Sequence, residues 1–318
     1  MRIFNLFLQK WMPILTPLSL ILGVLLKDIG HQLLFLIPLI FAFMTFASSL
    51  NMTFGDVKGV RKHPKLILMS IAFLHILMPI WAYFLSVVIF DDHLLTIGFM
   101  LSVAVPTGVT SVIWVNISKG NLPLCLSIIL IDTLLAPFIM PFLLKIIAGQ
   151  SIHFDTTSLI FDLLWMIVVP SILGILLNEL SKGKIQKRWG PLLAPFSKLS
   201  IFAIVMINSS VIAPYLLTVN GELFIVIIVV FCLAFSGYAF ALLMGHFLWK
   251  NTTDIATFLF TGGMRNIAVG VVIATTYFPA KVAMPIVFGM LFQQVLAAIF
   301  YRIFEKYQKN KSIKVATM

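Results

Sequence analysis

The chain has few charged residues and few cysteines. Only 10% of its 318 residues are charged, whereas 61% are hydrophobic and the mean hydropathy is +1.09. Soluble domains carry about 25% charged residues, so this composition excludes an ordinary soluble protein and indicates an integral membrane protein. Cys125 and Cys232 lie within apolar runs, which argues against a disulfide framework or a cysteine-rich metal site.

Signatures of catalysis and nucleotide binding are also missing. No Gly-x-x-x-x-Gly-Lys phosphate loop occurs, so we do not expect this chain alone to drive transport with ATP. Neither His-Glu-x-x-His nor Gly-x-Ser-x-Gly occurs, which argues against a membrane protease or lipase. We therefore expect neither an enzyme nor an organic cofactor. The short, mixed start before the first apolar run does not resemble a cleavable signal peptide.

Acidic residues are half as numerous as basic ones, 11 against 22, which gives a net charge of +11. The basic residues gather in alternate connections, such as 58–65 and 182–188, and at both ends of the chain. This placement fits membrane topology and anionic lipid headgroups better than nucleic acid. The positive-inside rule predicts a protein of the cytoplasmic membrane with both termini in the cytoplasm. Nothing in the sequence fixes its oligomeric state.

Long apolar runs dominate the rest of the chain. A crossing needs about 20 apolar residues. We expect ten spans, at about 12–27, 32–53, 66–90, 94–117, 122–147, 156–178, 191–216, 223–249, 254–277 and 282–304. The predicted fold is an all-α membrane protein with one membrane domain over 1–318. Residues 12–147 and 156–304 would form two five-helix repeats, and an odd number of spans per repeat inverts one repeat relative to the other.

Two of these runs are interrupted at matching places in the two halves. Pro106-Thr107-Gly108-Val109-Thr110-Ser111 interrupts the fourth, and Thr261-Gly262-Gly263-Met264-Arg265-Asn266 interrupts the ninth. Proline and glycine free backbone groups within a membrane helix, and those groups can bind ions or polar substrate atoms. Paired interruptions of this kind point to the binding site of an inverted-repeat secondary transporter. We predict that both segments, apart from Val109, line that site.

Three further polar side chains lie within the spans. Arg265 stays protonated, so it must face water, a carboxylate or a bound anion. It either binds substrate or takes part in coupling, or it forms a packing ion pair, for which Asp132 in the fifth span is the candidate partner. Asp132 is also a candidate proton relay or cation site. His75 in the third span is a side chain that titrates near neutral pH, and it serves either coupling or packing.

Several spaced motifs resemble the bile acid:sodium symporter family, and the likeness runs from about Pro13 to Tyr307. The first motif is Lys62-His63-Pro64-Lys65, followed by Met78-Pro79. The second is Pro106-x-Gly108-x-x-Ser111, followed by Lys119-Gly120-Asn121 and Pro137, and the third is Gly263-Met264-x-Asn266. The resemblance implies ten helices in two inverted repeats, a panel domain and a core domain, and broken fourth and ninth helices that cross. It also implies uptake of an organic anion, such as a bile acid, a pantoate-like acid or a sulfated conjugate, coupled to sodium.

The chain departs from the family pattern at the positions where the resemblance places sodium ligands. Val112 follows Ser111 where the family usually has asparagine, and the usual glutamine of the third helix falls on Leu74. The usual hydroxyls of the fifth helix fall on Cys125 and Ile129, and Glu-x-Gly-Met-Gln-Asn becomes Thr261-Gly262-Gly263-Met264-Arg265-Asn266. Hard cations prefer oxygen ligands. We therefore hypothesise that Arg265 replaces bound sodium, and leave the coupling ion open among sodium, a proton and none.

Our prediction is a secondary transporter that moves a small carboxylate or sulfonate anion by alternating access, with membrane lipid as its surroundings and no nucleic-acid partner. Two alternatives stay open. One is a sodium or proton antiporter of a related inverted-repeat fold that uses Asp132, and the other is a membrane sensor or scaffold that binds a ligand without transporting it.

Overall fold

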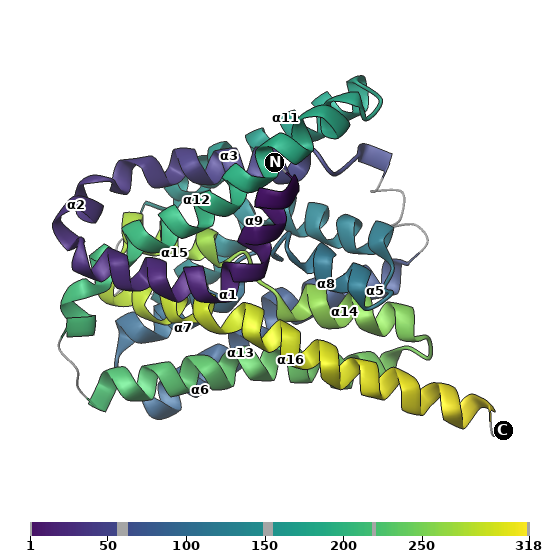
Figure 1. Cartoon of the computed structure of the whole chain (residues 1–318). Helices are drawn as coiled ribbons and strands as arrows, with labels where there is room; N and C mark the ends of the chain where they lie inside the picture. Colours follow the sequence, from purple (N-terminus) through teal and green to yellow (C-terminus); the bar gives the residue numbers. More distant parts are fainter. Residues whose placement is uncertain (1, 56–62, 149–154, 218–220, 317–318) are drawn as a thin grey trace.

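The computed structural model describes residues 2–55, 63–148, 155–217 and 221–316, and its extended elements are all helices (Figure 1). The predicted all-α class is confirmed. The first half contains α1 (Arg2–Leu25), α2 (Lys27–Gln32), η1 (Leu34–Leu36), α3 (Ile37–Ser49), α5 (Pro64–Ala72), the π-helical turn η3 (Phe73–Leu77), α6 (Met78–Ile89), α7 (His93–Ala104), α8 (Ser111–Ile117) and α9 (Leu122–Ala148).

The second half follows with α10 (Thr156–Leu163), the π-helical turn η4 (Leu164–Val168), α11 (Val169–Leu180), α12 (Lys184–Leu217), α13 (Gly221–Leu248), α14 (Thr252–Gly263), α15 (Ile267–Tyr277), η5 (Ala280–Val282) and α16 (Ala283–Ala316). At 1.5 Å per residue, the 34 residues of α16 reach about 50 Å, well beyond the hydrocarbon core of a bilayer. Its C-terminal end accordingly projects beyond the rest of the helices (Figure 1).

Six helical segments in the described part of the chain are long and apolar enough to cross a membrane, which makes this an integral membrane protein. They are Pro64–Ile89, Leu122–Ile147, Thr156–Leu180, Lys184–Leu217, Gly221–Leu248 and Ala280–Lys311. The other four predicted spans fall on shorter apolar helices, including Ile14–Leu25 and Leu34–Ser49. Two of these spans are short because their helices stop at the interruptions. One interruption separates α7 from α8, and the other separates α14 from α15.

The helices pack as two groups. In one group α12 contacts α1, α2 and α3, and α3 contacts α11, so that α1 and α12 run side by side (Figure 1). In the other group α13 packs on α14 and α16, α6 packs on α7, and α8 and α9 both contact α14. Contacts between the groups are sparser, and they include those of α12 with α15 and α16. Both interrupted helices belong to the second group.

Side-chain caps fix where two of these helices start. Asp92 accepts hydrogen bonds from the N–H groups of Leu94 and Leu95 at 2.8 and 3.0 Å, which begins α7. Asn251 accepts the Asp254 N–H at 2.7 Å and begins α14. Such caps satisfy backbone donors that have no partner within the helix. The two helices that lead into the interruptions therefore have defined starting points.

Candidate binding site at two paired helix interruptions

The two interruptions lie against each other. Thr107 and Arg265 form an isolated antiparallel β-bridge. The Asn266 N–H donates to the Pro106 carbonyl at 2.7 Å, and the Gly108 N–H donates to the Met264 carbonyl at 3.1 Å. In hydrocarbon an unpaired backbone group costs several kcal/mol, so each break satisfies the backbone groups that the other leaves open. The structure thus brings together the two segments that the sequence singled out.

Local sequence explains why each helix opens there. Val105 precedes a proline and has φ −63° and ψ 149°, because proline disfavours the helical conformation in the residue before it. Met264 is also extended, with φ −105° and ψ 129°, and follows the Gly262-Gly263 pair. Extended backbone on both sides is what allows the bridge to form.

Two glycines are required by close approach. A Cβ atom on Gly108 would lie 2.7 Å from the Arg265 carbonyl oxygen, and one on Gly263 would lie 2.2 Å from the Tyr238 ring. Both separations are shorter than real Cβ atoms show. Gly108 therefore lets the two interruptions touch, and Gly263 leaves room for the Tyr238 ring.

Arg265 is buried, and the two terminal nitrogens of its guanidinium lack a hydrogen-bond partner among the described residues. The residue is 6% exposed, and neither Nη1 nor Nη2 has a hydrogen-bond partner. Its backbone N–H donates to Gln293 Oε1 on α16 at 2.8 Å, so the backbone of the residue is held firmly while its charged end is free. Burial of a charged group without hydrogen bonds is costly, so these two nitrogens are donors available to a bound group.

A cavity of about 40 Å³ opens beside this guanidinium. A water molecule needs roughly 10–15 Å³ by this kind of measure, so the space fits a carboxylate or sulfonate head group and not a whole bile acid. Most of its wall is apolar, and the polar lining comes from Arg265, Gln293, Tyr238 and Ser102. Gln293 Oε1 is used by the Arg265 backbone, which leaves the NH₂ of that amide as a further donor.

The ion pair considered between Arg265 and Asp132 does not form. Asp132 instead contacts His75, with Oδ1 2.5 Å from Nε2, and its Oδ2 accepts the Thr107 N–H at 2.6 Å. Asp132 is fully buried and His75 is 5% exposed. The Asp132 charge acts on Arg265 through space without a hydrogen bond or ion pair between them. Asp132 thus contacts the β-bridge through the Thr107 N–H, and His75 on the π-helical turn η3 contacts Asp132.

The remaining predicted residues lie within or beside the interruptions. The Thr107 hydroxyl donates to the Thr261 carbonyl at 3.3 Å, and the Thr261 hydroxyl donates to the Thr257 carbonyl at 2.8 Å. Ser111 is buried, with its Oγ 3.8 Å from the Cys125 sulfur. Thr110 and Asn266 precede α8 and α15 and make no side-chain cap. The Thr107 and Thr261 hydroxyls are therefore already used by backbone carbonyls.

Two residues of the cavity were missed by reasoning from the sequence. Tyr238 donates its hydroxyl to the Gln293 carbonyl at 3.0 Å, and Gln293 orients Arg265. The polar pair Gln293-Gln294 within the last apolar run was the available signal. Asn208 on α12 is also fully buried, and neither of its amide atoms has a partner among the described residues.

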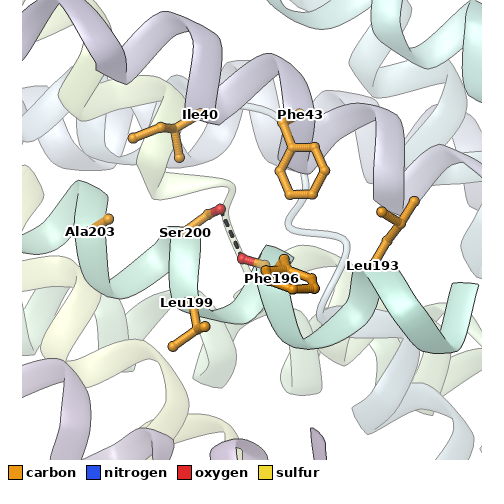
Figure 2. Close-up of a pocket in the computed structure, with 7 residues that line it drawn as sticks. All are labelled: Ile40, Phe43, Leu193, Phe196, Leu199, Ser200 and Ala203. Atoms are coloured by element: carbon orange, nitrogen blue, oxygen red, sulfur yellow. Dashed lines mark hydrogen bonds between the residues drawn. The ribbon is translucent and has the colours of Figure 1, made fainter. Parts of the chain in front are cut away.

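A second, wider pocket lies between α3 and α12, and none of the residues that line it is charged. Its volume is about 500 Å³. Figure 2 shows its lining, in which the one hydroxyl, that of Ser200, donates to the Phe196 carbonyl at 2.9 Å. The pocket is otherwise lined by Ile40, Phe43, Leu193, Leu199 and Ala203, so it offers nothing to hold an anion and has the character of a lipid-facing groove.

Comparison with known proteins agrees with the resemblance drawn from the motifs. Residues 38–219 match the Sodium Bile acid symporter family. The chain is 42% identical over 306 residues to the uncharacterized protein YbaS of Bacillus subtilis (strain 168), which covers 96% of this chain and all of that protein. It is 24% identical over 263 residues to the probable sodium/metabolite cotransporter BASS1, chloroplastic, of Arabidopsis thaliana, covering 81% of this chain and 63% of the plant protein. With the uncharacterized sodium-dependent transporter YocS of Bacillus subtilis (strain 168) it shares 23% identity over 278 residues, 86% of this chain and 84% of that one.

The chain is a membrane protein that belongs to the sodium bile acid symporter family.

Proposed function

We propose that the protein is a secondary transporter that moves a small organic anion across the cytoplasmic membrane by alternating access. The observation that carries this proposal is the buried Arg265 guanidinium, whose Nη1 and Nη2 have no hydrogen-bond partner in the described part of the chain and lie beside a cavity of head-group size. Guanidinium binds carboxylates and sulfonates through parallel N–H···O bonds, so the charge and the shape both favour an oxyanion.

The surroundings of Arg265 support an anion over a sodium ion. The positions that correspond to sodium ligands by resemblance hold Leu74, Cys125 and Ile129, all buried at 0–1% exposure and none offering a hard oxygen. We propose that the fixed charge of Arg265 at the interruption supplies the positive charge that a bound ion supplies elsewhere.

The packing suggests how alternating access would work. The anion site lies in the second group of helices, and the sparser contacts to the first group are those that a relative movement would change. We propose that residues 12–147 and 156–304 are inverted five-helix repeats, in a single domain with ten crossings and both termini in the cytoplasm. The basic character of 58–65, 182–188 and the C-terminal end supports this orientation.

A substitution at Arg265 tests the proposal. We expect purified protein in proteoliposomes to take up or exchange labelled pantoate or taurocholate, and Arg265→Gln to lose that flux. A hydrogen bond to a charged group contributes about 1.5–3 kcal/mol, so the loss of even one weakens anion binding at least about tenfold. Arg302→Gln, at an exposed arginine on α16, is the matched control and should transport normally.

Binding separates this function from its alternatives. A screen of organic anions by thermal shift should show stabilisation of the wild-type protein that Arg265→Gln lacks. Ligand stabilisation without any flux would instead identify a sensor or scaffold. Full activity in Arg265→Gln would show that the guanidinium serves only packing, and would overturn the proposal.

A further inference from the structure

We propose that His75 and Asp132 form a proton-binding site that couples proton movement to anion movement at Arg265. This inference rests on the proposed function and assigns its coupling ion. The pair is buried, in direct contact at 2.5 Å, and attached to the interruptions through the Thr107 N–H.

The Thr107 N–H donates to Asp132 Oδ2, and Asp132 Oδ1 lies 2.5 Å from His75 Nε2. We assign Asp132 as the carboxylate and place the proton of this second contact on His75 Nε2. His75 Nδ1 is then the unprotonated ring nitrogen. It is buried and has no hydrogen-bond partner among the described residues. A proton arriving from water adds to Nδ1 and yields an imidazolium paired with the carboxylate, and no bond between heavy atoms changes.

Charge balance links this proton to the anion. With neutral His75, the Asp132 carboxylate and the Arg265 guanidinium sum to zero, and a bound monovalent anion makes the site negative. With His75 protonated the three side chains sum to +1, which one anion neutralises. Asp132 acts on Arg265 through space, and in a low-dielectric interior an unbalanced charge is strongly disfavoured. Proton and anion therefore favour each other, and their joint movement is electroneutral.

Other ionisable groups do not disturb this balance by contact. Tyr238 faces Arg265 from α13, and the Cys125 thiol lies on α9 against Ser111. The elements packed on η3 and α9 place their remaining titratable side chains near helix ends or on exposed surface, namely Lys65, Tyr83, His93, Lys145, Asp162 and Asp254. Arg265 is thus the charged group that faces the pair from the interruptions.

The link is reciprocal. If proton binding strengthens anion binding by some factor, anion binding strengthens proton binding by the same factor, and couplings of this kind are typically about 5- to 150-fold. The π-helical turn that carries His75 is a feature that helices often retain at functional sites. A packing role for the pair predicts no such coupling.

The test uses wild-type protein and three variants in proteoliposomes, with labelled pantoate as the probe anion and pyranine in the lumen. Uptake is measured at pH 5.5 outside and 7.5 inside, at equal pH, and with a sodium gradient alone. We expect the inward proton gradient to raise wild-type accumulation at least about fivefold, with lumenal acidification that requires pantoate. The sodium gradient should have no effect. His75→Gln should lose the dependence on the proton gradient, and His93→Gln, at an exposed histidine, should keep it.

Asp132→Asn tests coupling through the pH dependence of pantoate affinity, which would not change if the pair served only packing. Removing the negative charge mimics the protonated pair, so pantoate affinity by thermal shift should become high and independent of pH between 5.5 and 8, whereas wild-type affinity falls as pH rises. Pantoate exchange that ignores the proton gradient, or accumulation driven by sodium, would overturn the coupling and leave the anion transporter standing. Absence of any exchange of pantoate or taurocholate by wild-type protein would overturn the proposed function, and the coupling with it.

Discussion

Replacement of Gly108 by alanine tests whether the two interruptions are in direct backbone contact. The added Cβ would lie 2.7 Å from the Arg265 carbonyl oxygen and 3.0 Å from its carbonyl carbon, and neither atom can rotate away. The segments would have to separate by about 0.7 Å to reach ordinary contact, which strains the 3.1 Å hydrogen bond from the Gly108 N–H to the Met264 carbonyl.

The size of the effect follows from these two contributions. Overpacking a filled interior costs roughly 1–3 kcal/mol, and loss of one buried backbone hydrogen bond adds roughly 1–3 kcal/mol. We therefore expect Gly108→Ala to lower the free energy of unfolding by about 2–6 kcal/mol. At about 2–4 °C per kcal/mol, the midpoint of thermal unfolding in detergent should fall by at least about 4 °C.

Gly289 provides the matched control. It lies on α16 beside the same cavity, but a Cβ there would meet only Ile267 Cδ1, at 3.6 Å, which is ordinary contact. Alanine is favoured over glycine within a helix by about 0.5–1 kcal/mol, so Gly289→Ala should melt at the wild-type temperature or slightly above it. If Gly108→Ala unfolds at the same temperature as Gly289→Ala, the bridge between Thr107 and Arg265 is not as close as the structure indicates.

Two further predictions concern stability. Asn208→Leu removes a buried amide that has no partner among the residues the structure describes, so it should raise the unfolding free energy by about 1–3 kcal/mol. A lower melting temperature would show that the amide has a partner in the membrane. Lys281 Nζ contacts Asp92 at 2.7 Å and Glu222 at 2.6 Å, but all three side chains are partly exposed, so Lys281→Met should cost only about 1 kcal/mol. Partial burial alone raises the pKa of Asp92, but the hydrogen bonds from Lys281 and from the backbone N–H groups lower it by more, so the net pKa lies below the ordinary 3.8. The contribution of Asp92 to the free energy of unfolding is therefore complete above pH 3.8, and it is lost as the pH falls through the lower pKa of the folded state. Melts of wild type and Lys281→Met should converge at strongly acidic pH, and a constant gap would contradict the pairing.

The sequence supported the helical class and the position of both interruptions, because these depend on local chemistry. Apolar composition implies helices in a membrane, and Pro106 and Gly262-Gly263 mark where they open. Residue depth within a span is also local, and it singled out Arg265, Asp132 and His75 as buried polar groups, as they are.

Partner choice was the part that could not be predicted. Asp132 pairs with His75 and not with Arg265, because residues 57 positions apart meet only through the packing of η3 on neighbouring helices. The same holds for Gln293, whose contact with the Arg265 backbone joins α16 to the interruption. Hydropathy places a side chain at a depth in the membrane but does not say which direction it faces around its helix.

The contacts that hold residue 265 in place are made by its backbone. The β-bridge to Thr107, the neighbouring bonds of Asn266 and Met264, and the N–H donated to Gln293 all use main-chain atoms of this segment. The identity of the side chain at 265 is therefore nearly independent of the scaffold. An amide, as the family motif has at this place, or a guanidinium can be exchanged there without dismantling the fold. One architecture can in this way change the charge that lines its cavity by substitution at very few positions.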